Sequence, residues 1–363
     1  MKSMNLCKKI YNNTALSTKY IEYFYDLIQR GDHIAKQTKK NISIHNRLMP
    51  LNTKYIPSTI LNYINTTTHK IYKVTGIINS KTIELYFICY ENTKVNIANY
   101  SNFVFLILYM LTIHEQNECS KLLSIKIYLT PFVKTTPITP ITPINNSLIL
   151  SKNEVNTGYS NIGCIARSEI VIYRKEEWAK VLIHELFHNL NLDFATLDIP
   201  PINRMLQKKF NLMINFDVNE CYAEIWSRLL LTFLESYYHS LSRNEFAINF
   251  NKLILREITF SLSQATKIWH IIKNSEPYSE KTNTFVYFIF TSGLIHNYAN
   301  FITWCNQNNR NLFYFNKTNK NVQGFTEFIL SSLKNKNYKL LLKCLSAIKP
   351  TKSMRMTHSD LSL

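Results

Sequence analysis

The sequence predicts an α+β fold in which a mixed sheet comes first and a mainly helical part follows. Two observations support this prediction. Segments rich in β-branched and aromatic residues lie between residues 71 and 173, where strands are expected. After residue 174, apolar residues recur with helical spacing almost to the end of the 363-residue chain.

Three segments before residue 174 have strand character. Residues 81–90 (KTIELYFICY) are β-branched and aromatic with partial alternation, and residues 124–130 (SIKIYLT) place three aliphatic side chains on one face. Residues 168–173 (SEIVIY) are rich in β-branched residues, which predicts a continuous strand. The apolar run at 102–114 predicts a buried helix between the first two strands.

The helical part begins directly after the third strand. Residues 174–191 predict a helix with Glu176 and Glu177 in its first turn, where the helix dipole favours negative charge. Further helices are predicted at 219–238 and near 325–348.

The net charge of +18 is concentrated at the two ends of the chain. Residues 1–75 carry 12 basic and 3 acidic side chains, and residues 306–363 carry 10 and 2. Such ends can make weak contacts with a polyanion such as nucleic acid. The sequence contains no finger spacing, RNP-like strand or Arg-rich run, so we expect no dedicated nucleic-acid module.

Two apolar runs raise the question of a membrane span. Residues 103–113 are about half the length that a span requires. Residues 285–305 are long enough but include His296, Asn297 and Asn300. We therefore expect a core helix or helix pair there, and no membrane span.

The seven cysteines are odd in number and irregularly spaced, and they form no CxxC pair. This pattern predicts reduced thiols in an intracellular protein. The first residues lack the apolar region of a signal peptide, so we expect that the protein is not secreted.

The sequence HELFH, within the predicted helix at 174–191, is the strongest chemical signal in the chain. Positions four apart share one helix face, so His184 and His188 present two imidazoles that a zinc ion can bind together. Glu185 lies next to the first histidine, where its carboxylate can reach a metal-bound water without occupying the metal.

A catalytic zinc requires a third protein ligand. One option is a ligand ten residues after His184, but that position, 194, is a phenylalanine. Asp193, one residue before it, is a weaker candidate for the third ligand. The helix predicted at 219–238 offers Glu220 and Glu224, which again lie four apart on one face. We assign Glu220 to the metal and Glu224 to the imidazole of a ligand histidine, a contact that would orient the ring. Glu224 as the third ligand remains an alternative.

HELFH followed by NECYAE resembles the zincin metallopeptidases, and within them the gluzincin branch. By this resemblance Glu220 matches the metal-binding glutamate and Glu224 the supporting acid, where Asp is more common. Residues 169–173 look like the edge strand along which such enzymes bind an extended substrate. The region around the motif also resembles uncharacterised HExxH proteins of large DNA viruses.

The resemblance implies a zincin-like fold and a zinc-dependent peptidase that acts on peptide or protein substrates, with Glu185 as general base. It covers roughly residues 120–230. The oxyanion donor that such a mechanism needs is open, with five candidates. These are Tyr222, Tyr238, His239, His296 and Tyr298. Two alternatives remain: a zinc-binding structural or virion-associated protein without turnover, and a basic nucleic-acid-binding protein.

We divide the chain into four parts on these grounds. Residues 1–75 form a basic, mainly helical extension, and residues 76–272 form the catalytic domain. Residues 273–350 form a C-terminal helical region, and residues 351–363 form a frayed tail.

Overall fold

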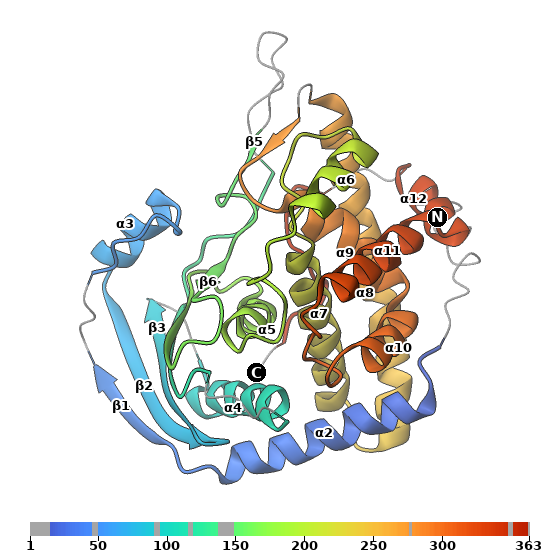
Figure 1. The fold of residues 1–363 in the computed structure, drawn as a ribbon. Helices are drawn as coiled ribbons and strands as arrows, with labels where there is room; N and C mark the ends of the chain where they lie inside the picture. The colour runs from blue at the N-terminus through green and yellow to red at the C-terminus, as the bar shows by residue number, and fades with distance from the viewer. Residues whose placement is uncertain are drawn as a thin grey trace.

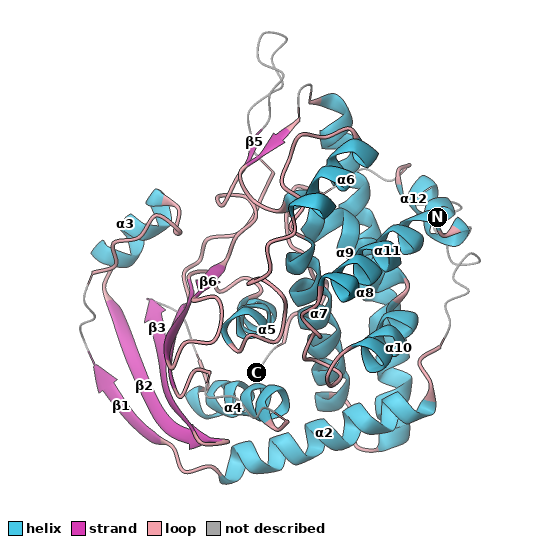
Figure 2. Cartoon of the chain, viewed as in Figure 1, coloured by secondary structure: helices cyan, strands magenta, loops and turns pink. Residues whose placement is uncertain are grey.

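The computed structural model describes residues 15–45, 50–90, 95–114, 119–136, 149–275, 278–347 and 351–361. The chain forms a mixed sheet packed against helices, which confirms the predicted α+β class (Figures 1 and 2). The sheet contains, in spatial order, β1 Asn41–His45, β2 His69–Ile78, β3 Lys81–Tyr90, β4 Leu122–Tyr128, β7 Arg167–Ile172 and β6 Gly158–Ser160. The helices are α2 Thr18–Gln37, α3 Ser58–Thr66, α4 Ile97–Thr112, α5 Trp178–Asn189, α6 Pro200–Phe210, α7 Val218–Tyr238, α8 Arg243–Asn274, η1 Val286–Phe290, α9 Thr291–His296, α10 Tyr298–Asn308, α11 Asn319–Lys334 and α12 Lys336–Leu345. A second, two-stranded sheet pairs β5 Ile149–Leu150 with β8 Ser279–Glu280.

The strand directions follow from the connections. β1, β2 and β3 are antiparallel, and Asn79 and Ser80, both with positive φ, make the tight turn between β2 and β3. β3, β4 and β7 are parallel, and α4 provides the crossover between β3 and β4. β2 runs across residue 75, and the division of the chain at that point stays a prediction.

The sheet is buried on both faces. One face places Leu85, Ile125 and Ile170 in the large core that includes α4 and α5. The other face places Ile88 and Val171 in a smaller cluster with residues of α3. Burial on both sides explains why the central strands read as nearly continuous apolar runs in the sequence.

The helix that carries HELFH lies between the sheet and α7, near the centre of the molecule (Figure 1). Every residue of α5 is buried. The helix begins at Trp178 rather than near 174, because Glu177 adopts a left-handed conformation with φ of 59°. The expectation that Glu176 and Glu177 occupy the first helical turn is therefore wrong.

Two other predicted helices differ in their bounds. α4 begins at Ile97 rather than 102, because the side chain of Asn96 accepts a hydrogen bond from Asn99 N at 3.2 Å and caps the helix. The helix expected at 325–348 is two helices, α11 and α12, since Asn335 is extended and caps α12.

The strand at residues 167–172 is not an edge strand, contrary to the prediction. β7 pairs with β4 on one side and with the short β6 on the other. β6 is antiparallel to β7 and forms the edge of the sheet nearest α5. The sequence does not reveal β6, because three residues carry too little pattern to mark a strand.

The prediction of a frayed tail is wrong for residues 351–361. Met354 and Thr357 are fully buried, and Met356 is 4 % exposed. Backbone pairing holds the segment, since Met354 N donates to Lys134 O at 2.9 Å and Thr136 N donates to Lys352 O at 2.8 Å. Its polar, methionine-containing sequence has no helical or strand period, so this packing was not evident.

The expectation of reduced thiols is wrong for Cys119, Cys164 and Cys344, which are disulfide-bonded. Cys119 and Cys164 form a disulfide, with Cα atoms 4.5 Å apart, that joins the start of β4 to the loop between β6 and β7. Cys89, Cys221 and Cys305 are buried free thiols. Because disulfides are rare in cytosolic proteins, the cysteines no longer support an intracellular location, which stays a prediction.

The apolar segment at 285–305 folds as η1, α9 and α10 within the core, as a helix pair would. Over the parts of the chain that the structure describes, no helix has the length and apolar character needed to cross a membrane.

Candidate metal centre

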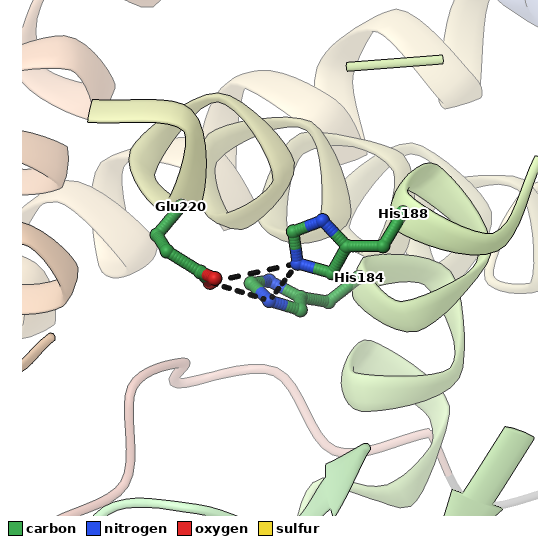
Figure 3. Close-up of side chains that lie close together, drawn as sticks. All are labelled: His184, His188 and Glu220. Atoms are coloured by element: carbon green, nitrogen blue, oxygen red, sulfur yellow. Dashed lines mark hydrogen bonds and ion pairs between the residues drawn. The ribbon is translucent and has the colours of Figure 1, made fainter. Parts of the chain in front are cut away.

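α5 and α7 bring His184, His188 and Glu220 together at one point (Figure 3). The Nε2 atoms of the two histidines lie 3.0 Å apart. Glu220 Oε2 lies 3.2 Å from His184 Nε2 and 3.5 Å from His188 Nε2. Within the described ranges, this is the group of His, Cys, Asp and Glu side chains arranged to hold a metal ion.

These separations fit a tetrahedral zinc ion. Two ligand atoms 2.0–2.1 Å from such an ion lie about 3.3 Å apart. The three observed distances of 3.0, 3.2 and 3.5 Å surround that value. Two imidazoles and one carboxylate also form a common ligand set of catalytic zinc, although other divalent transition metals accept the same donors.

A carboxylate lies behind each histidine. His188 Nδ1 donates a hydrogen bond to Asp193 Oδ2. His184 Nδ1 lies 3.3 Å from Glu224 Oε2. Both acids are buried, and contacts of this kind hold the opposite ring nitrogen, Nε2, toward a metal. We call the point on which the ligand atoms of His184, His188 and Glu220 converge the metal point. Asp193, which the sequence offered as a ligand, lies on the far side of His188 from it.

The electrostatics of the group reflect its two histidines and surrounding acids. Burial alone would lower the pKa of His184, but Glu220 and Glu224 outweigh burial and raise it. Burial is outweighed even more at His188, where Glu220 and Asp193 raise the pKa well above its usual value. Metal binding requires neutral imidazoles, so protons compete with the metal at low pH, and binding strengthens as the pH rises.

Glu185 lies beside the metal point, under strand β6. Its Oε2 accepts a hydrogen bond from Ser160 Oγ at 2.8 Å, which fixes the carboxylate. β6 can pass this close because residue 158 is glycine: a Cβ there would lie 2.8 Å from Val181 Cγ1 and 3.4 Å from Glu185 Oε1. Ser160 was not identified from the sequence, because β6 was not.

A cavity of about 40 Å³ opens beside His184 and Glu185. A site needs about 10–15 Å³ of such volume to hold a water, so the cavity has room for water among polar groups. Its walls are formed by Lys134, Val155, Asn156, Thr157, Gly158, Lys180, Val181, His184, Glu185, Glu224, Tyr287 and Met356.

Tyr287 is a site residue that the sequence analysis missed. Its hydroxyl donates to Glu220 Oε2 at 2.7 Å, and its ring centre lies 5.8 Å from that of His184. It belongs to η1, a π-helical turn, and such turns are frequent at functional sites. Nothing in the aromatic run around residue 287 distinguishes this tyrosine from its neighbours.

None of the five sequence candidates for an oxyanion donor is part of this group. Tyr222 donates to Phe313 O at 2.9 Å within the core, and His296 packs its ring against Tyr338. Tyr238 is the last residue of α7, whereas Glu220 lies in its first turn. His239 follows Tyr238 as the cap of the same helix, and Tyr298 is buried at the start of α10.

The burial of His296 predicts a pH dependence of stability. Burial lowers the pKa of His296 to about 4, from 6.5 for an ordinary histidine. Between these values the unfolded chain binds a proton that the folded chain does not, so the free energy of unfolding falls as the pH drops from 6.5 to 4. The loss is at most roughly 3 kcal/mol. Urea unfolding at several pH values gives the free energy of unfolding as a function of pH. We expect it to change less with pH for His296→Leu than for wild type, and an equal pH dependence would contradict the lowered pKa of His296.

Comparison of the chain with models of known families finds no match, and comparisons with curated proteins and with solved structures find none either.

Proposed function

We propose that this protein is a zinc-dependent peptidase of the zincin class, with a gluzincin-like ligand set. The observation that carries the proposal is the approach of His184, His188 and Glu220 to within 3.5 Å of one another, with Glu185 beside them. The resemblance of HELFH and NECYAE to gluzincins supports the same assignment. A cavity with room for water is lined by His184 and by Glu185, the proposed base.

Each residue of the group can be given a separate role in peptide hydrolysis. Zinc in such a site would lower the pKa of a coordinated water toward neutrality and polarise the substrate carbonyl. Glu185 takes a proton from the attacking water as its oxygen bonds to the carbonyl carbon, and later gives that proton to the leaving amine as the C–N bond breaks. Ser160 holds Glu185 in place, and Asp193 and Glu224 hold the two histidines.

Strand β6 is the surface that we assign to the substrate backbone. It is the edge of the six-stranded sheet on the side of α5, and it crosses directly over Glu185. An extended peptide can add to such an edge by main-chain hydrogen bonds. These bonds position the scissile carbonyl whatever the side chains of the peptide are.

The test of the proposal is cleavage of a peptide library by the purified chain. We expect cleavage that stops when a chelator removes zinc and returns when zinc is added. Zinc binding without cleavage would favour a structural or virion-associated zinc protein. Absence of zinc together with salt-sensitive DNA binding would favour the basic nucleic-acid-binding alternative.

Tyr287 is our candidate for the group that stabilises the oxyanion. Its hydroxyl lies beside the metal point, bonded to Glu220, and can turn toward a substrate carbonyl. We expect Tyr287→Phe to lower kcat by about 10²–10³-fold while bound zinc is retained, because one donor to the oxyanion is lost. Tyr238→Phe is the matched control, since its hydroxyl lies at the other end of α7. Equal rates for both variants would remove Tyr287 from the mechanism.

A further inference from the structure

The 351–361 segment lies against the N-terminal end of the helix that carries the two histidines. Two buried carboxylates hold its backbone. Glu177, which stands at the N-cap position of α5, accepts from Met356 N at 2.8 Å and from Thr357 N at 2.7 Å. Glu257 of α8 accepts from His358 N at 2.7 Å and from the Thr357 hydroxyl at 3.0 Å. The position of Met356 is therefore fixed relative to α5.

Lys180 connects this segment with the metal point. Lys180, His184 and His188 are spaced four residues apart, so they form one row on α5. The Lys180 ammonium donates to Glu224 Oε2 at 2.8 Å, and the same oxygen lies 3.3 Å from His184 Nδ1. Met356 Sδ lies 3.5 Å from the ammonium, and Met356 also lines the cavity beside His184.

The charges in this row are deeply buried. Lys180 is 2 % exposed and Glu224 is fully buried. Burial opposes ionisation of Glu224, but Lys180 outweighs burial and lowers the pKa of Glu224 to about 2. A buried carboxylate of this kind keeps its orientation only while its cation is held in place. The thioether of Met356 contacts the ammonium of Lys180, and both side chains line the cavity beside His184.

We propose that Lys180 and Met356 are positioning residues of the metal centre, which hold Glu224 against His184, so that the 351–361 segment is a working part of the site. The inference rests on the proposed zinc site. Glu224 directs the imidazole of His184, and Lys180 directs Glu224. Met356 keeps Lys180 on that carboxylate. Loss of support behind a metal-bound histidine typically weakens metal binding by 10–100-fold.

Met354 provides a matched control for Met356. Both methionines belong to the same segment and are buried, at 0 % and 4 % exposure. Met354 does not line the cavity beside His184, and its sulfur makes no hydrogen bond to Lys180. Alanine at either position removes the same side chain from the core, so the two variants should lose similar stability.

The experiment measures the zinc affinity of the full chain by competition with a chromophoric chelator, without any peptide substrate. We expect Met356→Ala and Lys180→Met to weaken zinc binding by about tenfold or more, and Met354→Ala to bind zinc as wild type does. The visible spectrum of the cobalt-substituted protein should change for the first two variants alone, because it reports the geometry of the ligands. Thermal unfolding checks that the two alanine variants are comparably stable.

Equal zinc affinities for Met356→Ala and Met354→Ala would overturn the inference while leaving the zinc site intact. If Met356→Ala fails to fold, Met356→Leu replaces it, since leucine keeps most of the buried volume without the thioether. We expect that variant to bind zinc several-fold more weakly than Met354→Leu. Absence of zinc binding in the wild type would instead refute the proposed function, and this inference with it.

Discussion

Replacing Glu185 with glutamine is expected to lower kcat by about 10²–10⁴-fold while the zinc content stays unchanged. Glutamine preserves the size of the side chain and can still bond to Ser160, but its amide cannot accept the proton of the attacking water. Glu185 is not among the three residues whose ligand atoms surround the metal point, so replacing its carboxylate should not release the ion. The measurements are initial rates on a cleaved peptide and metal content by mass spectrometry.

The control for this experiment is Glu22→Gln. Glu22 is exposed on α2 and has no part in the site, so this variant should keep wild-type turnover. Peptidase activity of Glu185→Gln equal to that of wild type would show that the mechanism is wrong. Zinc loss in Glu185→Gln would instead show that Glu185 supports the metal rather than the proton transfer.

Replacing His188 with alanine is expected to reduce bound zinc from about one ion per chain to almost none. The variant loses one of the three proposed ligands, and Glu220 and Asp193 lose the imidazole that lies between them. The proposed zinc would bind the folded state and stabilise it, so a chelator should lower the Tm of wild type. The same chelator should leave the Tm of His188→Ala unchanged.

His270→Ala is the matched control for the loss of a histidine. His270 is exposed on α8, outside the metal group, so zinc content should remain that of wild type. If His188→Ala retains zinc and a Tm that falls with chelator, the metal binds elsewhere in the chain. That result would contradict the proposed zinc site and the peptidase mechanism that depends on it.

The concentration of buried charge between α5 and α7 is itself an argument for function. Breaking one buried ion pair usually costs several kcal/mol, and apolar residues of similar size often serve stability equally well. Yet basic and acidic side chains follow one another in a row here, and the pKa values of His184, His188, Glu220 and Glu224 are shifted, as is frequent at functional sites. The row runs through Lys180, Glu224, His184, Glu220, His188 and Asp193.

The sequence by itself determined the parts of the site that repeat with helical spacing. His184 and His188, and likewise Glu220 and Glu224, lie four residues apart, and the geometry of a helix places each pair on one face. The strand at 81–90 was predicted with its observed bounds, because β-branched and aromatic residues between polar turns mark a strand locally. These properties depend on neighbours within a few positions.

Only the tertiary structure decided which residues from distant parts of the chain join those pairs. Tyr287 meets Glu220 across 67 positions, and Met356 meets Lys180 across 176. Such contacts depend on how whole elements pack, and packing leaves no period in the sequence. The same reason explains Asp193, which sequence spacing considered as a ligand and which folding places behind His188. The three-residue edge strand β6 and the packing of the 351–361 segment likewise depend on tertiary contacts and not on local sequence.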